Sequence, residues 1–179
     1  MNNDERKDMT NFRPMRRLRQ QLTENESREV LQRCKSGVLC LSGDEGYPYG
    51  VPMNYVLSGN NIYFHSAMQG HKVDAVCRND KASFTVVDTD EVKPAELTDY
   101  FRSVICFGRV QMVEKESEKL SALRKLGERY SPDYRDNAEK EISQAFPHVL
   151  ILRLSIDHIT GKEAIELRRK EGKLRSSVL

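Results

Sequence analysis

The sequence predicts a mainly β fold with flanking helices, in which six antiparallel strands close into a barrel. Short segments of alternating apolar and polar residues are separated by turn residues, which is the pattern of strands joined by tight turns. Segments with helical periodicity lie between and beside these strands. Because six antiparallel strands with mostly short connections would otherwise leave exposed edges, closure into a barrel is favoured.

The first half of the chain predicts three strands in an antiparallel meander. A short apolar strand covers 38–41, an alternating strand covers 49–57, and a third strand covers 62–65. The connections at 44–46 and 58–61 are rich in Gly, Asp and Asn, the residues that tight turns require.

The second half predicts three further strands. These cover 82–87, 100–114 and 149–156, and the acidic, proline-containing segment 88–98 is expected to be a loop. Gly108 interrupts the longest of these strands, which indicates a bend or a β-bulge at that position.

Four segments predict helices. Thr23 and Glu26 have the spacing of a capping box, and the helix that they begin is expected to end near Gly37. The other predicted helices cover 70–78, 116–130 and 136–145.

The composition indicates one globular domain with charged ends. Residues 1–20 form a polar arm, residues 21–162 the domain, and residues 163–179 a charged tail. The net charge of the chain is only +2, which disfavours a dedicated nucleic-acid binder. Basic residues nevertheless cluster in both ends of the chain. Solvated ends are the favoured interpretation, and an RNA or membrane contact is the alternative. The clustered residues are Arg13, Arg16, Arg17, Arg19, Arg168, Arg169, Lys170, Lys173 and Arg175.

Several classes of protein are disfavoured by missing patterns. No apolar run approaches the roughly 18–20 residues of a membrane span, and no signal peptide is recognisable at the start, so we expect a cytoplasmic protein without a membrane partner. The four cysteines lack C-x-x-C spacing and lie in apolar segments, which predicts reduced, buried thiols. No metal site is predicted, since no two histidines have i, i+4 spacing.

The most informative segment for function is the connection from the strand at 62–65 to the helix at 70–78. The first turn of that helix carries His71 and Lys72, although acidic residues are the usual choice at the positive end of a helix dipole. Ser66 adds a hydroxyl donor and Gly70 allows close approach to the backbone. A phosphate group would satisfy this set of donors, whereas the alternative is a solvated helix face.

A second feature lies in the strand at 49–57. Gly50, Pro52 and Asn54 share one face, and Pro52 removes a donor from the strand ladder. A flat ligand can lie against so small and partly polar a face. The alternative is an edge strand beside solvent.

Both features occur in order within a series that resembles the pyridoxamine 5′-phosphate oxidase-like flavoproteins, nearest the branch named for 5-nitroimidazole antibiotic resistance. The series extends from about residue 15 to residue 162. It comprises Gly46-x-Pro48-x-x-x-Pro52-x-Asn54-Tyr55, Ile62-Tyr63-Phe64-His65-Ser66-Ala67-x-x-Gly70-x-Lys72, Ala82-Ser83-Phe84-Thr85-Val86-Val87, Tyr100-Phe101-x-Ser103-Val104-x-x-x-Gly108 and Ile156-Asp157-His158-Ile159-Thr160-Gly161-Lys162.

The resemblance implies a split β-barrel homodimer with FMN at the subunit interface. The strand at 52–55 would run along the flavin ring, and the segment around Ser66 and Lys72 would hold the phosphate. His148 is a contact that the partner subunit would provide. The cofactor-binding residues implied are Pro52, Met53, Asn54, Tyr55, His65, Ser66, Ala67, Gly70, His71, Lys72, Ser103, Val104 and His148.

The function expected from this resemblance is reduction of a small electron-poor compound, such as a nitroaromatic or a quinone, with a reduced nicotinamide as the possible donor. Vitamin B6 oxidation is disfavoured because the chain lacks tryptophan and the arginine-bearing end of the true oxidases. No acid–base constellation is evident, and His71 is the single candidate for a catalytic side chain. The alternatives are a flavin-binding protein without turnover and a haem-binding barrel.

Overall fold

The structure, a computed structural model, describes residues 12–172, with the side chains of residues 135–137 excepted. The helices are α1 (Glu24–Arg33), α2 (His71–Arg78), α3 (Glu116–Tyr130), α4 (Arg135–Ala145) and α5 (Ile165–Lys170). The strands are β1 (Ser36–Ser42), β2 (Pro48–Asn54), β3 (Val56–Ser58), β4 (Asn61–Ala67), β5 (Lys81–Lys93), β6 (Thr98–Met112) and β7 (Val149–Glu163).

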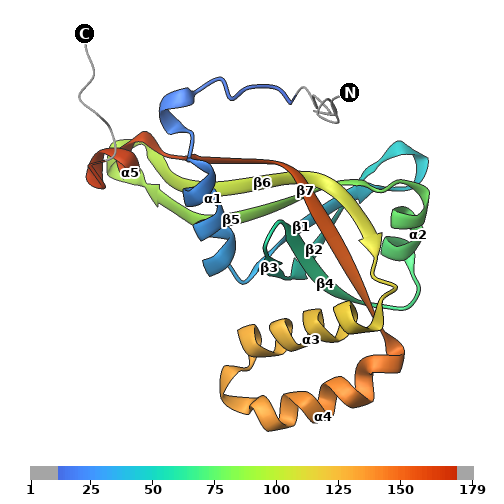
Figure 1. Ribbon diagram of the computed structural model, residues 1–179. Helices are drawn as coiled ribbons and strands as arrows, with labels where there is room; N and C mark the ends of the chain where they lie inside the picture. Colours follow the sequence, from blue (N-terminus) through green and yellow to red (C-terminus); the bar gives the residue numbers. More distant parts are fainter. Residues whose placement is uncertain (1–11, 173–179) are drawn as a thin grey trace, which may run out of the picture.

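The strands form one antiparallel sheet in the order β2-β1-β5-β6-β7-β4-β3. The two strands at the ends of this order, β2 and β3, are consecutive in the chain and meet at Tyr55. The sheet therefore curls back on itself into a split barrel, as predicted. In Figure 1 the helical hairpin of α3 and α4 lies below the strands, whereas α2 and α5 lie at opposite ends.

The prediction of six strands is wrong by one, because the segment 49–57 is two strands. β2 pairs with β1, whereas β3 pairs with β4 on the other edge of the sheet. Between them Tyr55 pairs with neither strand: its N–H donates to the Tyr130 hydroxyl at 2.9 Å, and its carbonyl lies 2.7 Å from the same oxygen. A side chain from α3 thus takes the place of a neighbouring strand.

The predicted loop at 88–98 is largely strand. β5 continues to Lys93 and pairs with the beginning of β6, after a register shift between Val87 and Thr89. The Asp88 carboxylate at this shift accepts two hydrogen bonds from Arg33 at 2.6 Å each. The acidic residues that predicted a loop therefore lie in the hairpin of β5 and β6. Arg33 of α1 neutralises the negative charge of Asp88 at the base of this hairpin.

The end of the chain also differs from the expected charged tail. β7 continues to Glu163 and α5 follows, where Arg168 donates to the Gln21 carbonyl at 2.5 Å. Of the basic residues in the expected tail, Lys173 and Arg175 lie outside the described residues. In the N-terminal arm, Arg13, Arg16, Arg17 and Arg19 are exposed.

The core fills the inside of the barrel and is covered by α1. The capping box of α1 is confirmed, since the Thr23 N–H donates to Glu26 at 2.7 Å and the Glu26 N–H donates to Thr23 at 3.2 Å. Buried side chains from α1 and five strands share one cluster; they include Val30, Leu31, Leu39, Phe64, Phe84, Val104 and Leu154. A second cluster lies between the sheet and the hairpin of α3 and α4.

The bulge predicted at Gly108 is confirmed, with a register shift between Phe107 and Gly108 opposite β7. A Cβ at Gly108 would lie 1.9 Å from the Ser155 carbonyl oxygen, so a larger residue is excluded by the backbone of β7. None of the described helices is long and apolar enough to cross a membrane.

Candidate functional site

The backbone of the connection between β4 and α2 has free space beside it at Gly70. Gly70 precedes α2 with a φ of 123°, a conformation that favours glycine, and a Cβ built there meets no atom within 4 Å. No side chain of the described residues caps the helix. A helix start without a side-chain cap leaves backbone N–H groups available, and an anion is favoured there.

Lys72 lies partly buried beside this opening. Partial burial lowers the pKa of its ammonium group, because desolvation disfavours the charged form. Desolvation is the single cause of this shift, and within residues 12–172 the ammonium group of Lys72 has no ion pair or hydrogen bond. An anionic ligand would stabilise a cation that is partly desolvated and has no counterion among the described residues.

Ser66 and His65 point to opposite sides of β4. Ser66 is buried on the same side as the core residues Ile62 and Phe64, whereas His65 is exposed on the other side. Of these two residues, Ser66 therefore lies on the side of β4 that faces the inside of the barrel. Ala67, the last residue of the strand, is exposed.

His71 is engaged by the β1–β2 hairpin. Its Nε2 lies 3.3 Å from an oxygen of Asp44, and its ring stacks on Tyr49 with centroids 4.0 Å apart. Arg78 binds the same carboxylate at 2.7 Å, and this hydrogen bond holds the pKa of Asp44 below its usual range. The His71 side chain thus attaches the hairpin to the start of α2, a contact that spacing along the sequence did not reveal.

The predicted ring contacts on β2 divide between surface and core. Pro52 and Asn54 are exposed on an edge strand, where the missing N–H of proline is tolerated. Met53 packs against the core. Tyr55 is fully buried; its hydroxyl donates to the Leu31 carbonyl at 2.6 Å, and burial raises its pKa.

Ser103 and Val104 likewise point to opposite sides of β6. Val104 is fully buried inside the barrel, whereas Ser103 lies on the outer face, opposite Val87 and Lys162. Val38 pairs with Pro52 on the same outer face, so apolar and small residues of several strands are presented together. Val38 is 37% and Val87 60% exposed.

His148 lies at the end of the sheet that also carries the β4–α2 connection. It precedes Val149, which is paired with Ala67, the last residue of β4. His148 therefore lies near this connection in its own chain.

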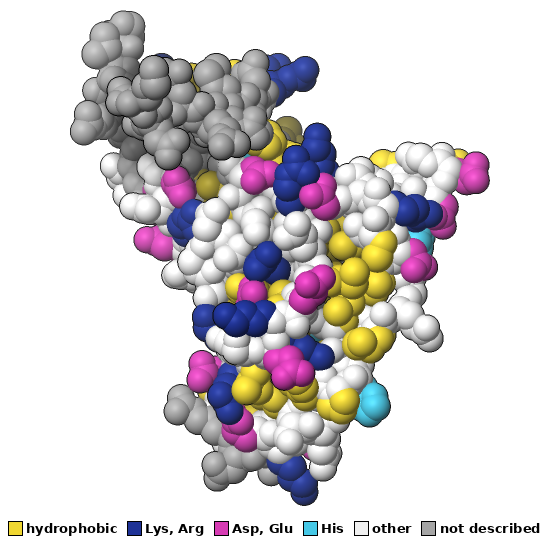
Figure 2. Space-filling view, turned by 45° about the vertical axis from the view of Figure 1, so that its right-hand side comes forward, with side chains coloured by type: hydrophobic (Ala, Val, Ile, Leu, Met, Phe, Trp, Pro, Cys, Tyr) yellow, Lys and Arg dark blue, Asp and Glu magenta, His cyan; other side chains and the backbone are white. Residues whose placement is uncertain are grey.

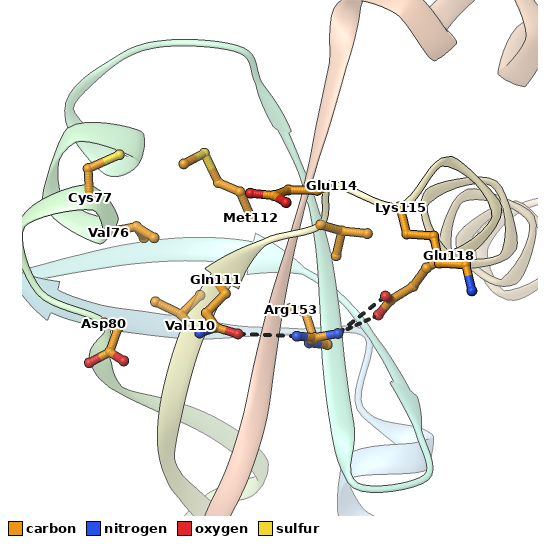
Figure 3. A pocket seen from close by; sticks show the side chains of 11 residues that line it. Val76, Cys77, Asp80, Val110, Gln111, Met112, Glu114, Lys115, Glu118 and Arg153 are labelled. Carbon is orange, nitrogen blue, oxygen red and sulfur yellow. Dashed lines mark hydrogen bonds and ion pairs between the residues drawn. The ribbon is translucent and has the colours of Figure 1, made fainter.

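A separate cleft of about 490 Å³ lies between α2, the end of β6 and the start of α3 (Figure 3). Arg153 lies in it and binds Glu118 at 2.9 and 3.2 Å and Gln111 at 3.1 Å. Figure 2 shows hydrophobic side chains gathered on one part of the surface. The exposed large hydrophobic side chains include Met68, just before α2, and Met112, at the end of β6. None of the predicted cofactor-binding residues lines this cleft.

The described residues include no group of three or more His, Cys, Asp or Glu side chains arranged to hold a metal ion. All four cysteines are free thiols, and Cys106 is buried as predicted. Cys77 is instead exposed on α2.

Comparison with family models decides the family. The model described as pyridoxamine 5′-phosphate oxidase matches residues 23–163, which include every strand and the β4–α2 connection. The chain belongs to this family. An uncharacterized relative from Rhizobium meliloti is 28% identical over 132 residues, which is 70% of this chain and 81% of the relative.

Several solved structures share this fold. A candidate 5-nitroimidazole antibiotic resistance protein from Bacteroides thetaiotaomicron has a TM-score of 0.65 at 24% identity, covering 80% of this chain and 86% of that one. A conserved hypothetical protein from Mycobacterium tuberculosis has a TM-score of 0.74 at 21% identity, covering 93% and 98%. An FAD-binding protein from Mesorhizobium loti has a TM-score of 0.57 at 25% identity, covering 80% and 96%.

Proposed function

We propose that this family member binds FMN, with the phosphate at the β4–α2 connection. The observation that carries the proposal is Lys72, a partly desolvated cation without an anionic partner among the described residues. Family membership and the FAD-binding protein from Mesorhizobium loti support a flavin rather than another phosphate ester. FMN has one terminal phosphate, which suits a single opening of this kind.

The residues at the opening fit that phosphate. Lys72 would supply a charge-assisted hydrogen bond, Ser66 a hydroxyl donor, and the start of α2 its free N–H groups. His71 is held by Asp44 and Tyr49, so its role is to fix the helix start rather than to bind phosphate directly.

The flavin ring would lie on the outer face of β2. This strand ends the sheet order, so one side of its backbone has no strand partner within the described chain, and Pro52 and Asn54 leave the surface low and partly polar. The flavin, when bound, supplies the electron-transfer chemistry. The protein's own contribution is to bind the ring and to control access to it.

The outer face supports a homodimer with the flavin at its interface. Val38 and Val87 are exposed beside Pro52 and Ser103, which leaves an apolar surface next to the expected ring position. A second copy of the chain covering this face would complete the ring site, and two-fold pairing is the commonest arrangement of soluble oligomers.

The proposed activity is transfer of electrons from a reduced nicotinamide to a small electron-poor acceptor, such as a nitroaromatic or a quinone. Support comes from the fold shared with the candidate 5-nitroimidazole resistance protein. A flavin reaction of this kind needs only hydride and electron transfer, so it requires no catalytic acid or base from the protein.

The test is the purified protein itself. A flavin absorbance spectrum, release of FMN on denaturation and tighter binding of added FMN than of FAD are expected, and a haem spectrum would be recognised at once. Oxidation of a reduced nicotinamide in the presence of a nitroaromatic or a quinone distinguishes a reductase from a flavin-binding protein without turnover. A colourless protein that fails to bind FMN at micromolar concentration contradicts the proposal.

A further inference from the structure

The corner between β2 and β3 is held by a single hydroxyl group from α3. The Tyr130 oxygen lies 2.9 Å from the Tyr55 nitrogen, 2.7 Å from the Tyr55 carbonyl and 2.5 Å from the Lys35 carbonyl. A phenol has one hydrogen to donate, so it accepts from the Tyr55 N–H and donates to one of the two carbonyls. One side chain thus replaces the ladder bonds that Tyr55 lacks.

The same hydroxyl is connected to Asn54. The Lys35 carbonyl that lies beside Tyr130 also accepts a hydrogen bond from the Asn54 side-chain amide at 3.2 Å. Asn54 is exposed at the end of β2, and Tyr55 follows it. Tyr130 thus fixes the peptide between Asn54 and Tyr55 directly, and the Lys35 carbonyl beside it holds the Asn54 side chain.

Arg129 strengthens the junction from the neighbouring position of the helix. Its guanidinium donates to the Cys34 carbonyl and lies over the rings of Tyr55 and Tyr130, at 5.5 and 5.9 Å from their centroids. The last turn of α3 thereby holds the connection from α1 to β1 as well as the β2–β3 corner.

Contacts along the rest of α3 show that the helix braces the barrel over its length. Near its start, Glu118 accepts a hydrogen bond from the Tyr63 hydroxyl at 3.0 Å, and in its middle Lys125 donates to Ser58 at 2.5 Å. Figure 1 shows α3 lying directly below β3 and β4. The hydrogen bonds of its last turn reach Tyr55 at the corner next to the proposed ring surface.

We propose that Tyr130 is a positioning residue for the flavin ring: its hydroxyl holds the Asn54–Tyr55 backbone in the conformation that the ring contacts. This inference rests on the proposed function, because it concerns where the ring lies. A preformed binding surface does not have to be ordered when the ligand binds, so fixing this corner favours affinity. Tyr130 acts through Tyr55 and Lys35 and touches no reacting atom.

The experiment compares two variants that each remove one tyrosine hydroxyl between α3 and the sheet. Tyr130→Phe frees the β2–β3 corner, whereas the matched control Tyr63→Phe breaks the hydrogen bond to Glu118 near the other end of α3. The measurements on the full-length protein are the Kd of FMN and of riboflavin by quenching of flavin fluorescence, the visible spectrum of the bound flavin, and the Tm of the flavin-free protein.

Tyr130→Phe is expected to raise the Kd of FMN and of riboflavin by the same factor, roughly three- to tenfold, the effect of one neutral hydrogen bond. The two Kd values should rise by the same factor because the substitution affects binding of the ring, which both ligands have, and not binding of the phosphate. The visible absorption band of the bound flavin is also expected to change in shape. Tyr63→Phe should lower the Tm while changing neither Kd nor the spectrum.

An unchanged Kd and spectrum in Tyr130→Phe overturns the inference, as does an equal loss of affinity in both variants, which would mean that α3 has only a general bracing role. If the wild-type protein binds neither flavin, the proposed function itself fails, which is a separate result. Should Tyr130→Phe not fold, Arg129→Gln removes the guanidinium that lies over the rings of Tyr55 and Tyr130 and so loosens the same corner. An unchanged flavin Kd in that variant would equally overturn the inference.

Discussion

The Nε of Arg102 donates a hydrogen bond of 2.6 Å to the carboxylate of Glu163, which is completely buried at the end of β7. Arg168 of α5 lies 3.1 Å from the other carboxylate oxygen, as an ion pair rather than a well-aligned hydrogen bond. Arg102 also binds Glu171, and Arg168 also binds Glu26 of α1. This cluster attaches α5 and α1 to the sheet.

Removing the central carboxylate should therefore destabilise the fold strongly. Glu163→Ala leaves two largely buried guanidinium groups without their shared partner, and we expect a loss of about 2–4 kcal/mol in the free energy of unfolding. The control is Asp80→Ala, which breaks the exposed pair with Arg109 and should cost less than about 1 kcal/mol. Urea unfolding of the two variants measures both changes, and similar losses would contradict a central role for Glu163.

Two glycines should respond oppositely to the same substitution. Gly108→Ala places a Cβ 1.9 Å from the Ser155 carbonyl, so the backbone of β6 or β7 must move and stability should fall. Gly127→Ala in α3 meets side-chain atoms only at 3.6 and 3.7 Å, and alanine favours the helix by about 0.5–1 kcal/mol. Thermal unfolding should show a lower Tm for the first variant and an equal or higher Tm for the second. A tolerated Gly108→Ala would mean that the bulge relaxes without cost.

The contrast between these glycines bears on what a sequence can predict. Gly108 was recognisable because a glycine inside an alternating strand indicates a bulge, and the start of α2 was recognisable from the turn residues around Gly70. The division of 49–57 into two strands could not be predicted from the sequence. It depends on the hydroxyl of Tyr130, which is 75 residues from Tyr55 in the sequence. In the sequence Tyr130 is simply one more residue on the apolar face of a helix.

The candidate site has the same limits. Local order placed Ser66 and Lys72 beside a helix start, since these residues are neighbours in the chain. The engagement of His71 by Asp44 and Tyr49 depends on how the β1–β2 hairpin folds back onto α2. One prediction from charge was wrong: the acidic residues after Val87 predicted a loop. Arg33 and Arg102 neutralise the carboxylate of Asp88, and strand β5 continues past it.

The Arg33–Asp88 pair should make stability depend on acidic pH. The hydrogen bond from Arg33 lowers the pKa of Asp88 below its ordinary value of 3.8, so the folded state binds fewer protons than the unfolded state in this range. The contribution is complete above pH 3.8 and is lost as the pH falls through the lowered pKa. Asp88→Asn should flatten the fall in unfolding free energy with acidification, measured by urea unfolding between about pH 6 and pH 2. Parallel curves for wild type and variant would contradict this.

The proposed dimer predicts that charge on the outer sheet face will separate the subunits. Val87→Asp changes a side chain that is 60% exposed, so the subunit should still fold, but the carboxylate would be buried without a partner at the interface. Sedimentation should show a dimer for the wild type and a monomer with weakened flavin binding for the variant. The control is Tyr134→Asp, at an exposed position beside α4 and away from that face, which should remain dimeric. A wild type that binds flavin as a monomer at all concentrations would exclude the dimer.

Lys72→Ala tests the phosphate assignment by comparing two ligands that differ only in the phosphate. A charge-assisted hydrogen bond to phosphate contributes roughly 1.5–3 kcal/mol, so FMN affinity should fall about ten- to a hundredfold while riboflavin affinity hardly changes. Lys81→Ala, which removes an exposed lysine at the start of β5, is the matched control and should leave both affinities unchanged. The preference of the wild type for FMN over riboflavin should also decrease with salt, since the opening at Gly70 faces solvent. Fluorescence titrations of each protein with each ligand measure all of these effects. Equal losses for FMN and riboflavin in Lys72→Ala would place the lysine's influence on the fold or the ring, and the phosphate would have to bind elsewhere.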